Sequence, residues 1–205
     1  MSDMGIEDIN KYRILLASRS PRRKELLKNL GLNFEVEVRD WTEEYPSHLK
    51  GEEIALYVAR SKARTFRSGI GDNEIVITAD TIVWCKNKVL DKPAGRDDAI
   101  KILKEISGNT HRVITGVCLL SKSKFVSFFS STKVTFSELT NDEIEYYVDS
   151  FRPYDKAGAY GIQEWIGLAA CSHIEGSYFN VMGLPVEQVY HELHKFIAPI
   201  PLKGI

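Results

Sequence analysis

The stretch ILLASRSPRRKELLKNLG, residues 14–31, is a short apolar run that leads directly into an amphipathic helix pattern. Residues 14–17 have the length and apolar character of a buried strand. Three leucines then recur on one helical face between residues 21 and 30, and Gly31 is a typical helix stop. A strand that runs straight into a helix is typical of α/β proteins rather than of helical bundles or β-sandwiches.

The alternation of strand and helix patterns continues along the rest of the chain. Strands are predicted at 34–38, 74–84, 89–90, 111–120 and 124–136, and helices at 52–66, 96–106, 140–148 and from about residue 185. The segment 89–90 is expected to pair with 74–84, and the two strands after residue 110 to form a hairpin. We expect one α/β domain over residues 1–205, built of two intimate lobes, with residues 1–12 as an N-terminal tail.

Composition places the chain among ordinary globular proteins. It has 205 residues, 43% of them apolar, with 27 basic and 28 acidic residues and a net charge of −1. The three widely spaced cysteines form no CxxC pair, and no apolar segment is long enough for a signal-peptide core or a membrane span. We therefore expect reduced thiols and a cytoplasmic protein that has no membrane partner.

The near-neutral total hides two blocks of opposite charge. Residues 11–28 contain seven basic residues against one acid, whereas residues 29–59 contain seven acids against two bases. This distribution excludes a uniformly basic coat for nucleic acid, and it leaves room for a site that handles both signs of charge.

The first turn of the helix after Ser20 carries the wrong charge for its position. Ser20 is a suitable N-cap and Pro21 a suitable first helical residue, so Arg22 and Arg23 fall where the helix dipole is already positive. A bound anion resolves this conflict, because backbone amides and arginine side chains then converge on phosphate oxygens. The alternative is a solvated basic face that pairs with the acidic block.

Two further positions carry polar groups that could take part in chemistry. Asp80 and Thr81 interrupt a strand that is otherwise apolar, and a buried carboxylate is costly unless it is paired or binds a metal. Asp80 is therefore a candidate metal ligand or general base, with the capping of a neighbouring amide as an equally good alternative. Lys92, in a turn after the strand at 89–90, is a weaker candidate because turn lysines are usually solvated.

The loops at 155–163 and 176–185 are rich in glycine and aromatic residues, which suits backbone that approaches a flat ligand closely. Gln163 can both donate and accept hydrogen bonds, as the reading of a base edge requires. Ordinary packed loops are the alternative. The sequence contains neither the P-loop nor the Rossmann glycine motif.

Taken together, three segments resemble the Maf family of nucleoside triphosphate pyrophosphatases. They are LASRSPRRKELLKNLGLNF, ADTIV with DKPAGRDDAIKIL and SGNTHRVITGV, and YDKAGAYGIQ with IEGSYFNVMGLPVEQV, in the family's order from about residue 14 to 193. The resemblance implies cleavage between the α and β phosphates with a divalent cation, Mg²⁺ or Mn²⁺. It also implies a mixed, elongated central sheet flanked by helices, as in inosine triphosphate pyrophosphatases, with the site in a cleft between two lobes.

The same resemblance assigns roles to individual positions. Substrate-binding positions correspond to Ser18, Arg22, Arg23, Lys62, Thr81 and Gln163; catalytic positions to Asp80, Lys92 and Glu43; and metal ligands to Glu43 and Asp80. In the branch with K-A-G-x-Y-x-I-Q, the substrates are dTTP and UTP, and Arg22, Thr81 and Gln163 correspond to specificity positions. The chain departs from the common pattern at Thr42 and Asp91, where the family often has Asp and Gly.

Other functions remain as alternatives to the hydrolysis of dTTP and UTP. The family is associated with the removal of non-standard nucleotides and with septum formation, so a nucleotide sensor of cell division without turnover is one rival. A pyrophosphatase for 7-methyl-GTP or another modified nucleotide is a second. A nucleic-acid-binding module is disfavoured, because the acidic block follows the basic one directly. A homodimer is expected by analogy only.

Overall fold

The computed structural model describes residues 5–42 and 44–198, in which seven strands form one mixed sheet. The strands are β1 (Arg13–Leu16), β2 (Phe34–Val36), β3 (Glu74–Cys85), β4 (Lys88–Leu90), β5 (Thr110–Leu120), β6 (Phe125–Phe136) and β7 (Cys171–Glu175). The helices are α1 (Ile6–Ile9), α2 (Pro21–Asn29), α3 (Glu52–Arg64), α4 (Arg96–Ile106), α5 (Asn141–Phe151), the 3₁₀ turn η1 (Ala157–Ala159), α6 (Trp165–Ala170), α7 (Tyr178–Met182) and α8 (Val186–Ile197). None of the helices in these ranges is long and apolar enough to cross a membrane.

The strand order is β2-β1-β3-β5-β6-β7, with β4 paired to the far half of β3. The pairs β1–β2 and β1–β3 are parallel, and the remaining pairs are antiparallel. The predicted pairing of 89–90 with the long strand and the predicted β5–β6 hairpin are both confirmed. The sheet is therefore mixed and elongated, as predicted, with long central strands and short outer ones.

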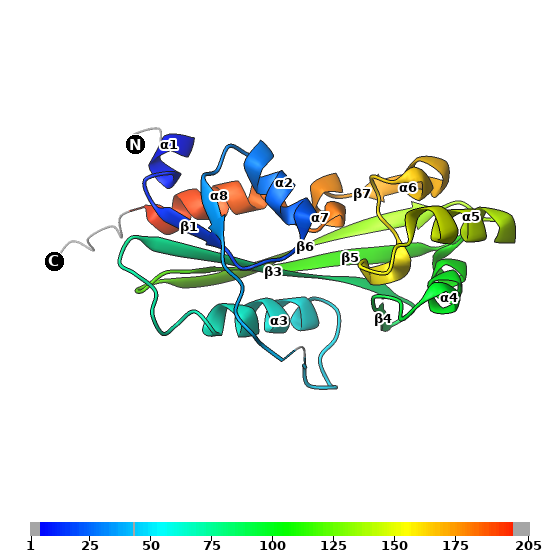
Figure 1. Cartoon of the computed structure of the whole chain (residues 1–205), viewed down its shortest axis with the longest axis horizontal. Coiled ribbons are helices and arrows are strands. Elements are labelled where there is room, and N and C mark those ends of the chain that lie inside the picture. Colours follow the sequence, from blue (N-terminus) through cyan, green and yellow to red (C-terminus); the bar gives the residue numbers. More distant parts are fainter. Residues whose placement is uncertain (1–4, 43, 199–205) are drawn as a thin grey trace.

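Helices cover the sheet on both faces (Figure 1), α3 on one side and α1, α2, α7 and α8 on the other, while α4, α5 and α6 gather at one end. The approach of α3 is close at Gly116 of β5, where a Cβ atom would lie 2.4 Å from the Ala55 backbone. Only glycine allows such contact between helix and sheet backbones. This contact fixes the distance of α3 from β5.

Buried apolar side chains form two large clusters at opposite ends of the sheet. One joins β4, α4 and α5 to the far half of β3, and the other joins β1, α2 and α8 to its first half. Within the stretch expected to be an N-terminal tail, residues 6–9 form α1, and Ile9 is buried in the second cluster. The two clusters share β3, whose two halves they cover.

Local signals placed several helix ends correctly. Ser20 caps α2 through the Arg23 amide, with Pro21 as the first helical residue, and Thr140 and Glu143 form the predicted capping box of α5. The strand predicted at 34–38 is shorter, ending at Val36, which lies at the edge of the sheet and is exposed.

Candidate active site

A cavity of about 930 Å³ opens in a gap along one edge of β3. The parallel partner β1 pairs with β3 only as far as Ile77, and β4 begins to pair with it only at Val83. The intervening residues, including Asp80 and Thr81, pair with neither of these strands. Ligands of α/β proteins commonly bind beyond the carboxyl ends of parallel strands, and this cavity has that position.

The cavity gathers residues from distant parts of the chain. Its walls include eight of the nine predicted site residues: Ser18, Arg22, Arg23, Lys62, Asp80, Thr81, Lys92 and Gln163. The ninth, Glu43, lies outside the described residues. Lys92 and Gln163 are exposed at the walls, whereas Ser18 is buried. The fold thus places these eight side chains around one space, and their chemical roles remain predictions.

Alternation along β3 sends its polar side chains to opposite faces of the sheet. Thr78 donates a hydrogen bond to the Ala59 carbonyl of α3, so Asp80, two residues further on, also faces α3. There the Lys62 ammonium lies 2.7 Å from Asp80 Oδ1, with both side chains at most 15% exposed. No residue of the described segments donates a hydrogen bond to the second oxygen, Oδ2.

The aromatic ring of Trp41 completes the surroundings of this ion pair. Lys62 Nζ lies 4.5 Å from the centroid of the indole ring, within the range of a cation–π interaction. Trp41 itself lines the cavity. The ring and the Asp80 carboxylate together hold the Lys62 ammonium at the α3 side of the cavity.

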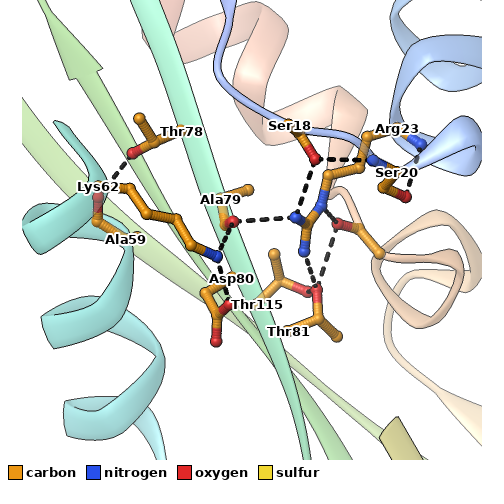
Figure 2. Close-up of polar contacts among 11 residues, drawn as sticks. Ser18, Ser20, Arg23, Ala59, Lys62, Thr78, Ala79, Asp80, Thr81 and Thr115 are labelled. Atoms are coloured by element: carbon orange, nitrogen blue, oxygen red, sulfur yellow. Dashed lines mark hydrogen bonds and ion pairs between the residues drawn. The ribbon is translucent and has the colours of Figure 1, made fainter. Parts of the chain in front are cut away.

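The Arg23 guanidinium donates most of its hydrogen bonds to other groups of the protein. Its Nε donates to the Gly183 carbonyl at 2.8 Å, Nη1 to the Ala79 carbonyl at 2.9 Å and to Ser18 Oγ at 3.3 Å, and Nη2 to Thr81 Oγ1 at 2.9 Å. Burial lowers the pKa of the guanidinium, while the charge of nearby Asp80 opposes this shift. Figure 2 shows Arg23 and Lys62 approaching the Ala79 carbonyl from opposite sides of β3. The sequence predicts phosphate binding by this arginine, but most of its donors are already used inside the protein.

The Thr81 hydroxyl is also hydrogen-bonded within the protein. Besides accepting from Arg23, it lies 2.9 Å from Thr115 Oγ1 of β5 and 3.3 Å from the Gly183 carbonyl. Thr115 in turn donates weakly to the Asn180 carbonyl of α7, at 3.4 Å. This polar network fixes the turn after α7 against β3 and β5 at the wall of the cavity (Figure 2).

Arg22, by contrast, reaches across the cavity. Its Nη1 lies 3.0 Å from Asp155 Oδ2, and the side chain of Asp155 is mostly exposed. Burial alone would raise the pKa of Asp155, but hydrogen bonds from Lys156 and Arg22 outweigh this effect and lower it. The remaining donors of Arg22 make no hydrogen bond to side chains of the described segments, so this arginine can also bind an anion.

The arrangement suits a ligand with a strongly anionic part and a polar, planar part. Arg22, Lys62 and Lys92 are among the cationic side chains that line the cavity, together with the Asp80 carboxylate. Arginine and lysine are the usual partners of phosphate oxygens. Gln163 lines the same cavity with an amide that can both donate and accept hydrogen bonds.

Several cavity residues were missed from the sequence. Trp41, Asp155 and Lys156 all line the space, and Lys156 is buried in spite of its charge. The glycine-rich character of the 155–163 loop marked the region, but the burial of a lysine depends on partners that no local pattern indicates. No group of three or more metal-ligating side chains occurs within residues 5–42 and 44–198.

The chain is similar to known proteins over almost its whole length. A family model described as Maf-like protein matches residues 13–196. A dTTP/UTP pyrophosphatase of Bacteroides fragilis is 52% identical over 189 residues, covering 92% of this chain and 98% of that protein. A protein of the same name from Phocaeicola vulgatus is 53% identical over 191 residues, covering 93% of this chain and 99% of that protein.

Among solved structures, similarity is much lower. The Ham1 protein of Staphylococcus aureus aligns with a TM-score of 0.40 and 11% identity, covering 60% of this chain and 71% of that chain. A similarity of this size carries no conclusion about fold or function.

Proposed function

The chain belongs to the Maf-like protein family, and from that premise we propose that it hydrolyses nucleoside triphosphates to the monophosphate and pyrophosphate, with dTTP and UTP as preferred substrates. The relatives that carry the name dTTP/UTP pyrophosphatase match almost the whole chain, with 52% and 53% sequence identity. This extent of similarity supports the transfer of both the reaction and the substrate class.

The observation that carries the proposal is the set of side chains that line one cavity. Arg22, Lys62 and Lys92 supply positive charge, Asp80 supplies a carboxylate, and Gln163 supplies a group able to read a base edge. Phosphoryl transfer is catalysed mainly by positioning and by stabilisation of charge, and these side chains provide both.

In the proposed reaction, a water oxygen attacks the α-phosphorus and the bond from this phosphorus to the bridging oxygen breaks. Pyrophosphate leaves with that oxygen, and the monophosphate keeps the oxygen of the water. The proton of the attacking water passes to one of the two predicted catalytic carboxylates, Asp80 or Glu43. Lys62, Lys92 and Arg22 stabilise the negative charge that develops on the leaving pyrophosphate.

The donor set fits a divalent cation that is carried with the substrate. Mg²⁺ is usually bound by one or two carboxylates together with substrate phosphates, rather than by a cage of protein ligands. Asp80 lines the cavity with one carboxylate oxygen that takes no hydrogen bond from residues 5–42 or 44–198. Asp80 would hold the cation together with Glu43, which lies outside the described residues. When bound, Mg²⁺ or Mn²⁺ would neutralise part of the phosphate charge.

A pyrophosphate-release assay over common and modified nucleotides tests this function. We expect release from dTTP and UTP that depends on Mg²⁺ or Mn²⁺, with slower release from purine nucleotides and 7-methyl-GTP. Reaction in ¹⁸O-labelled water should place the label in the monophosphate. Tight binding of dTTP without pyrophosphate release would contradict the proposal and favour a sensor. Label in the pyrophosphate would contradict attack at the α-phosphorus.

A further inference from the structure

A series of ion pairs runs from the predicted specificity position Arg22 to Glu164, the residue directly after the second such position, Gln163. Arg22 pairs with one oxygen of Asp155, and the Lys156 ammonium lies 2.8 Å from the other. Lys156 also lies 3.0 Å from Glu164 Oε1, directly after Gln163 in the sequence. The Lys156 side chain is only 10% exposed, although it carries a full charge.

At the Glu164 end of this series of ion pairs, Tyr147 contacts the backbone that precedes Gln163. Tyr147 of α5 is fully buried, and its hydroxyl donates to Glu164 Oε2 and accepts from the Gly161 amide at 3.0 Å. A Cβ atom on Gly161 would lie 2.7 Å from the Glu164 carboxyl carbon, so the carboxylate rests directly against this glycine. Glu164 is thereby held from both sides, by Lys156 and by Tyr147.

The residues next to Gln163 have little freedom of their own. Ile162 is buried in the core, and a Cβ atom on Gly167 would lie 1.8 Å from its carbonyl oxygen. Glu164 is also the N-cap residue of α6, and its backbone carbonyl accepts a hydrogen bond from the Gly167 amide at 3.0 Å. Gln163 is thus a single exposed residue between two immobilised neighbours, and its side chain lines the cavity.

We propose that Lys156 is a positioning residue for nucleotide selectivity, which acts by fixing Gln163 relative to Arg22 through Glu164 and Asp155. This inference rests on the proposed function, because it assumes that Gln163 reads the base. A buried charge with two partners is costly to assemble, and such pairs serve to fix a unique geometry in some proteins. Recognition of a base edge depends on donor and acceptor positions to within a fraction of an ångström.

The readout is the ratio of affinities for two nucleotides that are not hydrolysed. We choose α,β-methylene dTTP and α,β-methylene dGTP, measured by calorimetry with Mg²⁺ present, because this ratio reports base selection independently of turnover. The wild-type protein should favour the dTTP analogue. Lys156→Met should reduce this preference by between about 10-fold and 100-fold, the range expected for small misplacement of a binding group.

Three further variants separate positioning from loss of folding. Lys156→Met combined with Glu164→Gln leaves no uncompensated charge, and Tyr147→Phe removes one hydroxyl only; both should also reduce the preference. Lys133→Met is the matched control, because Lys133 forms an exposed pair with Glu175 away from the cavity, and it should leave the ratio unchanged.

The decisive step repeats Lys156→Met in a Gln163→Ala background. If Lys156 acts through Gln163, the substitution should change the ratio no further there. The inference is overturned by an equal effect in both backgrounds, by an unchanged ratio in the folded variants, or by a wild-type protein that binds the two analogues equally. Pyrophosphate release by the wild type is measured in a separate assay. A failure of the proposed function can then be distinguished from a failure of the inference about Lys156.

Discussion

The Lys62 ammonium lies 2.7 Å from the Asp80 carboxylate, in a part of the cavity where both side chains are largely shielded from water. The pair joins α3 to β3 at the point where β3 has no strand partner on its cavity side. A shielded pair of this kind contributes little net stability, but the loss of one member leaves the other uncompensated. We therefore expect this pair to matter more for the proposed reaction than for folding.

Asp80→Asn should leave the fold intact and abolish pyrophosphate release. The amide keeps an oxygen near Lys62 but can neither accept the proton of the attacking water nor bind a cation strongly. Pyrophosphate release and the melting temperature should be measured together. Asp72→Asn, at an exposed carboxylate that pairs with Lys122, is the control and should behave like the wild type. Turnover near the wild-type rate in Asp80→Asn would remove Asp80 from the reaction.

Lys62→Met should lower kcat/KM for dTTP by about 10²- to 10³-fold, as expected when one preorganised donor to the developing charge is lost. The methionine retains most of the packing against Trp41. Lys122→Met, at an exposed lysine, is the matched control. A loss confined to KM would show that Lys62 binds the ground state and the transition state equally, and would contradict its proposed role.

Two adjacent arginines should respond differently to truncation. Arg23→Ala removes the closest hydrogen-bond donor of the Ala79 and Gly183 carbonyls and one partner of the Thr81 hydroxyl, so the free energy of unfolding should fall by about 2–4 kcal/mol. Arg22→Ala removes one partly exposed pair with Asp155 and should cost about 0–1 kcal/mol. Urea unfolding of both variants measures the difference, and equal losses would contradict the internal role of Arg23.

The contrast between these arginines also shows which features of the site a local sequence pattern cannot predict. The strand at 14–17, the cap at Ser20 and the first helical turn follow from local chemistry and were predicted correctly. The Gly183 carbonyl, which accepts from Arg23, lies 160 residues further along the chain. Which of two neighbouring arginines points inward is decided by that distant contact, so a local pattern could not separate them.

Dependence on contacts that are distant in the sequence also explains which parts of the fold were not predicted. The region 165–182 forms α6, β7 and α7, all of which are short and were not predicted. These elements are stabilised by partners from other segments, such as the pairing of β7 with β6, rather than by a long periodic pattern of their own. The long strands β3, β5 and β6 were predicted because their apolar runs are long enough to be distinctive.

Gln163→Ala should remove much of the preference for pyrimidine nucleotides while leaving the phosphate chemistry in place. The substitution deletes an exposed side chain, so it should change the melting temperature little. We expect kcat/KM for dTTP and UTP to fall toward the values for the other nucleoside triphosphates. Gln188→Ala on α8 is the matched control. An unchanged ranking of the substrates would exclude Gln163 from base recognition.

The buried imidazole of His111 should make the protein less stable in mild acid. His111 is only 2% exposed, its Nε2 hydrogen-bonds the Tyr160 hydroxyl at 2.7 Å, and burial lowers its pKa to about 4. In the unfolded chain a histidine has a pKa of about 6.5, so below this pH the unfolded state binds a proton that the folded state does not. The free energy of unfolding should therefore fall as the pH is lowered from about 6.5 to about 4, by roughly 3 kcal/mol at most.

Urea unfolding of the wild type and of His111→Gln across this pH range isolates that contribution, because the other titrating groups are common to both proteins. The glutamine keeps a partner for the Tyr160 hydroxyl but cannot titrate. The wild type should lose stability relative to the variant between pH 7 and pH 4, and an NMR titration should find the His111 ring neutral down to about pH 5. Because His111 and Tyr160 pack against each other beside the 161–164 loop, a stability difference that does not vary with pH would mean that this part of the core admits water.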